Sequence, residues 1–113
     1  LICYDIEFAP LIRDLAGRGA QLVLCPTANM QPFTHVAQVT VPSQAVNHAV
    51  AIAYANYCGT EGDLTYCGGS VLVGADGAGH ARAGLAEALL IAELPDPDAS
   101  LLSTQLTDFR PVE

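Results

Sequence analysis

Cys3 follows an apolar stretch and precedes a helical pattern, a position in which a thiol can act as a nucleophile. Leu1 and Ile2 indicate the end of a buried strand, and apolar residues recur at helical spacing after Pro10. A strand–turn–helix corner exposes its side chain at the end of a sheet. It also leaves backbone N–H groups unpaired, and these can stabilise a developing oxyanion. The sequence therefore predicts a nucleophilic thiol at this corner.

Activation of this thiol is not explained by the rest of the chain. A free thiol has a pKa of about 8.5 and needs a base or a cation beside it to ionise at neutral pH. The chain has no lysine, and its four basic residues are scattered arginines, at positions 13, 18, 82 and 110.

The composition indicates one folded domain, or part of one. Of 113 residues, 51% are hydrophobic and only 14% are charged, which excludes a disordered tail and calls for burial on several faces. So high a share of apolar residues also fits a piece of a larger domain, in which other elements would cover the apolar faces. The first residue is Leu1 rather than a methionine, and it lies in a predicted strand, so we expect an N-terminal portion to be absent.

The net charge and the spacing of residues exclude several classes of partner and ligand. A net charge of -8 would repel nucleic acid and anionic membranes. No apolar run approaches the roughly 20 residues that span a bilayer, and no basic segment precedes an apolar run in the manner of a signal peptide, so we expect a soluble, cytoplasmic protein with reduced thiols. The cysteines and histidines lack the spacing of metal ligands, and the glycines fit no phosphate loop. No metal and no cofactor are predicted.

The first half of the chain predicts a β-α-β unit. A helix over residues 10–16, closed by Gly17 and Gly19, is followed by a strand over residues 21–25 that ends at Pro26. Parallel strands present their carboxyl ends at one edge of a sheet. Cys3 and residues 26–29 are therefore expected to lie together.

The second half predicts further strands of a mixed α/β domain. Residues 30–41 are irregular or weakly helical, residues 42–48 favour a helix, and residues 50–56 favour a buried strand. Residues 68–74 and 89–94 are predicted as strands, with a turn at residues 75–77. Asp98 or Ser100 is expected to cap a short C-terminal helix.

Motifs along the chain resemble those of the nitrilase superfamily of carbon–nitrogen hydrolases. Residues 2–8, ICYDIEF, resemble its nucleophile motif I-C-Y-D-x-x-F-P-E, and residues 19–29 resemble G-A-x-L-L-L-x-P-T-A-N. Further positions match in order at residues 53–56, 59, 69–70, 76–77 and 108–111. The resemblance covers essentially the whole chain.

This resemblance implies a nitrilase-type α-β-β-α sandwich and a Glu-Lys-Cys catalytic set. The cysteine attacks a nitrile or amide carbon, the glutamate transfers protons, and the lysine with a backbone N–H stabilises the oxyanion. Water then releases the thioester as a carboxylic acid. The family's glutamate and lysine precede its cysteine. Residues 1–113 are thus expected to form the C-terminal portion of a single domain, inactive without the portion that carries Glu and Lys.

The same resemblance assigns site residues at the corner. Cys3 is the expected nucleophile and the backbone N–H of Tyr4 an oxyanion donor, while Asp5 caps the helix. Glu7 is expected to reach the substrate pocket and to disfavour substrates that carry a carboxylate. The alternative for Glu7 is a solvated charge that favours the following helix.

Further along, Thr27, Ala28 and Asn29 are expected to line the same pocket, with turn formation as the alternative for Asn29. Two departures from the family pattern stand out. Ala9-Pro10 replaces Pro-Glu, and Gln44 with Asn47-His48 replaces the charged R-A-x-E-N segment. A neutral pair can substitute for that charge pair at little cost in stability.

Two other functions fit the sequence alone. One is a non-catalytic dimerisation or interaction module of hydrolase fold, and the other is an unrelated α/β redox protein in which Cys3 pairs with a resolving cysteine. If the chain is a hydrolase, its substrate is a small amide or nitrile, with carbamoyl and ω-amide compounds also open. The resemblance implies a homodimer or higher homo-oligomer for the complete protein.

Overall fold

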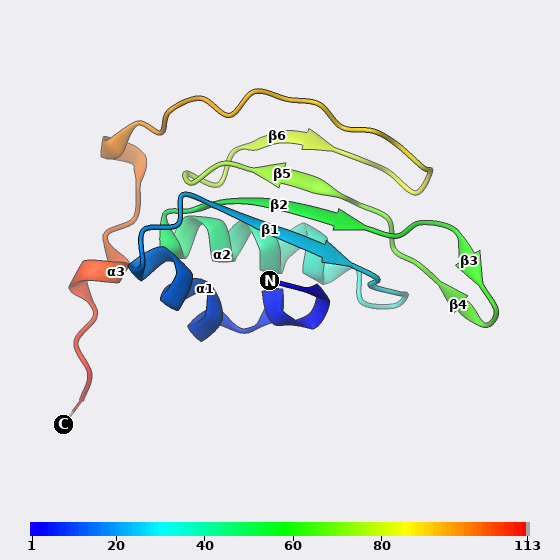
Figure 1. Ribbon diagram of the computed structural model, residues 1–113, viewed down its shortest axis with the longest axis horizontal. Helices are drawn as coiled ribbons and strands as arrows, with labels where there is room; N and C mark the ends of the chain where they lie inside the picture. Colours follow the sequence, from blue (N-terminus) through cyan, green and yellow to red (C-terminus); the bar gives the residue numbers. More distant parts are fainter. Residues whose placement is uncertain (113) are drawn as a thin grey trace.

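The computed structural model describes residues 1–112, which form a mixed α/β fold around one four-stranded sheet. The strand order is β1-β2-β5-β6 (Figure 1), with β1 and β2 parallel and the other neighbours antiparallel. A small hairpin of β3 and β4 extends beyond the end of β2. The strands are β1 Leu22–Thr27, β2 Ala51–Asn56, β3 Thr60–Glu61, β4 Leu64–Thr65, β5 Val71–Val73 and β6 Gly79–Arg82.

The helices before β2 cover one face of this sheet (Figure 1). A 3₁₀ turn, η1, is followed directly by α1, and a π-helical turn, η2, continues into α2. Pro10 and Pro42 occupy early positions of α1 and α2, where a missing N–H costs no hydrogen bond. These elements are η1 Cys3–Glu7, α1 Ala9–Gly17, η2 Val36–Thr40 and α2 Val41–His48; near the C-terminus follow η3 Ala99–Leu101 and α3 Gln105–Asp108.

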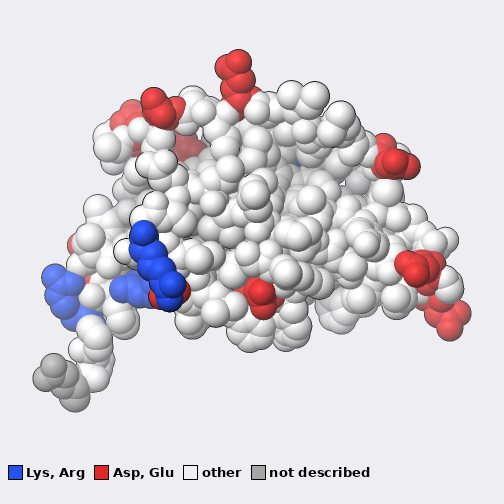
Figure 2. Space-filling model, viewed as in Figure 1, with Lys and Arg blue, Asp and Glu red and all other residues white. Residues whose placement is uncertain are grey.

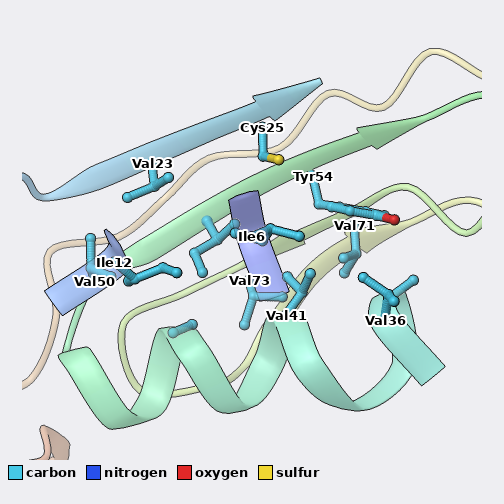
Figure 3. Packing of buried hydrophobic residues seen from close by; sticks show 13 residues of the cluster. Ile6, Ile12, Val23, Cys25, Val36, Val41, Val50, Tyr54, Val71 and Val73 are labelled. Atoms are coloured by element: carbon cyan, nitrogen blue, oxygen red, sulfur yellow. The ribbon is translucent and has the colours of Figure 1, made fainter. Parts of the chain in front are cut away.

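The alternation of side chains in β1 separates the two faces of the sheet. Val23 and Cys25 point toward the helices and are buried, whereas Leu22 and Leu24, on the opposite face, are 43% and 62% exposed. Figure 3 shows Ile6 of η1 and Val41 of α2 packed against the buried face. Burial of such side chains contributes about 1.5–3 kcal/mol each, so this one-sided core holds the corner at Cys3 against the sheet.

The structure confirms the mixed α/β class and most of the predicted elements. The helices predicted at residues 10–16 and 42–48 form as α1 and α2, and the strand predicted at residues 50–56 forms as β2. The left-handed conformation of Gly19, with φ of 97°, lies just past the end of α1. Asp98 caps η3 by accepting the Ser100 N–H at 2.9 Å.

The strand predicted at Leu1 and Ile2 is wrong. Ile2 has an extended backbone, but its side chain is 70% exposed, and the hydrogen bond from this segment to the sheet is that of the Leu1 amino group to the Leu24 carbonyl oxygen, 3.3 Å. The parallel pair of the sheet is instead β1 with β2, joined through α2. Cys3 therefore lies beside the carboxyl end of β1 without a strand of its own.

The strand predicted at residues 89–94 is also wrong. Leu89 and Ile91 are 86% and 85% exposed in irregular structure, while the strand after the turn at residues 75–77 is β6. Two smaller corrections concern strand ends. β1 continues through Pro26 because an edge strand tolerates a missing N–H, and Gly68 and Gly69 lie before β5, with φ of 59° and 70°.

After β6 the chain returns alongside the sheet and ends near α1 (Figure 1). The Arg13 guanidinium lies 4.6 Å from the Phe109 ring centroid and fixes this return. In Figure 2, the visible arginines gather at the end near α1 and α3, whereas Asp and Glu are spread over the rest of the view. None of the helices described in residues 1–112 is long and apolar enough to cross a membrane.

Candidate active site

The corner that carries Cys3 is strained and tightly fixed. Cys3 has φ of 53°, in the left-handed region that side chains other than glycine rarely occupy. On one side of it, the Asp5 carboxylate accepts the Ile2 N–H at 3.0 Å and so caps η1; it does not cap the predicted helix, α1, whose N-cap is Phe8. On the other side, the buried Gln44 amide donates to the Ile6 carbonyl at 3.2 Å. The corner therefore holds its conformation through hydrogen bonds at both ends.

The strained corner opens into a cavity of about 280 Å³ at the carboxyl end of β1. All the site residues predicted from the sequence line it: Cys3, Tyr4 and Glu7 from η1, and Thr27, Ala28 and Asn29 from the end of β1. The expected juxtaposition is thus present, although η1 rather than a strand brings Cys3 to the carboxyl end of β1. The chemical roles of these residues stay predictions.

Five further residues of the cavity were not predicted as site residues. Ile6, Met30, Phe33, Val36 and Tyr54 supply most of its apolar wall. The loop from residue 30 to η2 carries no periodic pattern, so its aromatic and thioether side chains gave no positional signal. Tyr54 could have been found from its position, because it pairs with Cys25 in the β1–β2 register and lies on the same face of the sheet.

Hydrogen bonds around Cys3 favour its thiolate. The backbone N–H of Ala28, followed by the Thr27 hydroxyl and the Tyr4 N–H, lowers the pKa of the Cys3 thiol. Partial burial and the nearby Asp5 carboxylate oppose this shift but do not outweigh it. Donors alone, without a basic side chain, therefore make this thiol more acidic than an ordinary cysteine.

Cys25 lies next to this corner in a different environment. Its thiol approaches the Cys3 carbonyl oxygen at 3.7 Å, and its side chain is 1% exposed. Burial raises the pKa of the Cys25 thiol. All four cysteines are free.

Tyr4 and Glu7 stand at the open side of the cavity. The Tyr4 ring is 64% exposed and stacks on Phe8, with 4.9 Å between ring centroids, so its backbone rather than its ring faces Cys3. Glu7 is exposed and lines the cavity. A carboxylate at the rim fits the predicted selection against acidic substrates, and the alternative, a solvated charge before α1, fits the same exposure.

The wall of the cavity contains one unusual polar group. Tyr54 is 2% exposed, and its hydroxyl is buried without a hydrogen bond of good geometry within the described residues. Burial raises the pKa of Tyr54 to about 12, although nearby Thr27 and Asn29 side chains pull the other way. Among residues 1–112, no three His, Cys, Asp or Glu side chains are placed to hold a metal ion together.

Comparison with known proteins identifies the family. The family model for carbon-nitrogen hydrolases matches residues 1–102. The chain belongs to the carbon–nitrogen hydrolase family. The chain is 47% identical, over 114 aligned residues, to the "hydrolase in pqqF 5' region" of Pseudomonas protegens, covering 98% of this chain and 40% of that protein. It is 34% identical over 95 residues to an (R)-stereoselective amidase of Pseudomonas sp, covering 83% and 35%.

Solved structures agree with this family and with its fold. An amidase from Nesterenkonia sp. AN1, of the nitrilase superfamily, matches with a TM-score of 0.87 and 43% identity, covering 97% of this chain and 41% of that one. In a variant of that amidase, acrylamide has added to the active-site cysteine. The chain therefore has the fold of part of a nitrilase-superfamily amidase and spans about two fifths of the length of its relatives.

Proposed function

We propose that residues 1–113 form the C-terminal portion of one carbon–nitrogen hydrolase domain and supply its nucleophile, Cys3. The observation that carries this proposal is a strained Cys3 at the mouth of a cavity that Tyr4, Thr27 and Ala28 also line, with donors from these three residues lowering the pKa of its thiol. Such a constellation suits attack on a carbonyl carbon. Amidases among the relatives and structural neighbours support an amide substrate.

In the proposed reaction the Cys3 thiolate adds to the amide carbon, and the C=O electron pair moves onto oxygen. The Tyr4 N–H lies beside the nucleophile and donates to that oxyanion. The oxyanion then collapses and breaks the C–N bond, and the departing nitrogen takes a proton as ammonia or amine. Water attacks the resulting thioester and releases a carboxylic acid and the Cys3 thiol.

Two members of this machinery are expected in sequence beyond these residues. Proton transfer to the leaving nitrogen needs an acid, and the oxyanion needs a cation for full stabilisation, yet the chain has no lysine. The family resemblance assigns these tasks to a Glu and a Lys that precede the cysteine. We therefore propose that the 113-residue chain does not turn over amides by itself.

A chimera tests this function. The segment of the Nesterenkonia amidase that precedes its matched C-terminal portion is joined to this chain, and hydrolysis of acetamide is followed by ammonia release. We expect activity from the chimera, none from its Cys3→Ala variant and none from the 113-residue chain. Hydrolysis that survives loss of Cys3, or a folded chimera without activity, would contradict the proposal.

The chain alone gives a second test that does not depend on the chimera folding. Acrylamide is expected to modify Cys3 before Cys25, Cys58 or Cys67, as identified by peptide mass spectrometry. Formation of a Cys3–Cys25 disulfide under mild oxidation, in place of a selective adduct, would favour the redox alternative. An unreactive Cys3 would favour the interaction module.

Glu7 is proposed to set selectivity between neutral and acidic amides. In the chimera, Glu7→Gln should raise the relative kcat/KM for an amide with its own carboxylate, such as succinamate, by roughly threefold to tenfold over propionamide, because one rim charge is removed. Glu87→Gln, at an exposed carboxylate that does not line this cavity, serves as the matched control. An unchanged ratio would leave Glu7 as a solvated charge.

A further inference from the structure

Asn56, the last residue of β2, makes three hydrogen bonds through its side-chain amide. Its Oδ1 accepts the Asn29 N–H at 2.7 Å, and its Nδ2 donates to the Asn29 carbonyl at 3.1 Å and the Gly68 carbonyl at 2.9 Å. Both amide hydrogens and the oxygen are thus engaged. The Asn56 side chain therefore binds both the N–H and the carbonyl group of Asn29.

The backbone around Asn56 completes this grip. The Tyr57 N–H donates to the Thr27 carbonyl at 3.2 Å, so the residue before Ala28 is held as well as the one after it. Asn56 itself is braced from behind, because its N–H donates to the Ser70 hydroxyl at 2.8 Å. The loop over residues 27–29 is thereby clamped between the end of β2 and the segment before β5.

Ala28 lies at the centre of this clamped loop and lines the cavity together with Cys3. Its methyl side chain cannot form hydrogen bonds, so the direction of its backbone N–H is set by its two anchored neighbours. Asn56 does not line that cavity. Any influence of Asn56 on the thiol must therefore pass through the loop.

We propose that Asn56 is a positioning residue that holds the Ala28 N–H against the Cys3 sulfur by clamping Asn29. The inference rests on the proposed function only in taking Cys3 as the nucleophile. The electrostatic environment agrees, since the Ala28 N–H is the largest influence that lowers the pKa of the Cys3 thiol. Without the clamp, the loop is free to rotate this donor away from the sulfur.

The test measures thiol ionisation in the 113-residue chain. Alkylation of Cys3 by iodoacetamide is followed by peptide mass spectrometry between pH 5 and pH 10 for the unmodified chain and for Asn56→Ala. We expect the midpoint of the Asn56→Ala profile to move upward toward the ordinary thiol value, with alkylation at pH 7 slowed roughly threefold to tenfold. Asn47→Ala, at an exposed asparagine of α2, should leave the profile unchanged.

The same digest separates positioning from loosening of the fold. A variant whose packing has loosened would expose buried Cys25 and speed its alkylation, without a specific shift in the Cys3 midpoint. Asn56→Ser, which keeps a hydroxyl near Asn29, should lie between Asn56→Ala and the unmodified chain. Wild-type midpoints in both variants, with Cys25 still protected, would overturn the proposal.

A measurement on the unmodified chain decides the matter if the variants do not fold. In two-dimensional NMR, the Ala28 amide proton should shift as Cys3 ionises, and the Asn29 amide should exchange slowly with solvent because Asn56 accepts it. An Ala28 amide that ignores the Cys3 titration would refute the inference. Since no turnover is measured, this result is independent of whether the complete protein hydrolyses amides.

Discussion

Cys3 and Cys25 are neighbours, because the Cys25 thiol lies 3.7 Å from the Cys3 carbonyl oxygen. Their surroundings nevertheless differ in backbone conformation, exposure and hydrogen-bond donors, which control thiol reactivity. Cys3 occupies a strained turn at the mouth of a cavity, where N–H and hydroxyl donors lower the pKa of its thiol. Cys25 lies within β1, buried on the face of the sheet that the helices cover (Figure 3). The pKa of the Cys3 thiol is lowered and that of the Cys25 thiol is raised.

This difference ties the lowered pKa of the Cys3 thiol to hydrogen-bond donors at the end of β1 and at Tyr4, not to a nearby basic side chain. Neither thiol has a basic side chain to ionise it, in a chain with a net charge of -8. The donors of Cys3 are available because the chain leaves β1 at Thr27 and its next N–H groups no longer belong to the sheet. Cys25, three residues from Ala28, gains none of them.

The largest expected contrast between the two thiols is in alkylation rate. At pH 7, iodoacetamide should modify Cys3 at least about 100-fold faster than Cys25 in the folded chain, since Cys3 is both accessible and more acidic. The ratio should fall to within about threefold in 6 M urea, where the two surroundings become alike. Comparable rates in the folded chain would remove the distinction on which the site rests.

A second contrast concerns stability in alkali. The pKa of the Cys25 thiol is higher in the folded chain than in the unfolded chain, so the protonated thiol stabilises the fold. This stabilisation is complete below about pH 8.5, the ordinary thiol value, and is lost as the pH rises through the folded pKa. Cys25 should therefore lower the free energy of unfolding by up to about 1.4 kcal/mol per pH unit above that value, until its folded pKa is passed, in addition to the effect of Cys67, whose thiol pKa burial also raises.

Urea unfolding at several pH values measures this slope. Cys25→Ala lowers stability overall but should flatten the slope between pH 8.5 and pH 10. Cys3→Ala should not flatten it, because the lowered pKa of Cys3 has the opposite sign: its contribution is present above the unfolded pKa and is lost as pH falls through the folded pKa. Equal slopes in the unmodified chain and Cys25→Ala would exclude Cys25 as the cause.

The sequence predicted this neighbourhood better than it predicted the sheet around it. The ordered motifs correctly placed Cys3 beside residues 27–29, although the strand expected to end at Cys3 does not form and only β1 presents its carboxyl end there. The sequence did not predict β6, because Gly79, His80 and Arg82 have little of the apolar alternation that is typical of a strand. This segment becomes a strand because it pairs with β5 after a tight turn. The clamp by Asn56 depends on contacts between segments 27 residues apart, which no local pattern contains.

The smallest contrast is in backbone strain. At Cys3, with φ of 53°, glycine avoids the contact between the side chain and the backbone that costs roughly 1–2 kcal/mol, although it adds freedom to the unfolded chain. Cys3→Gly should therefore be more stable than Cys3→Ala by about 0.5–1 kcal/mol in urea unfolding. The ordinary order should hold in α2, where Ala45→Gly is expected to cost about 1 kcal/mol or more relative to the unmodified chain. If Cys3→Gly were instead the less stable variant, the backbone at Cys3 would not be held in the left-handed conformation. The orientation of the thiol toward its cavity would then depend on its hydrogen bonds alone.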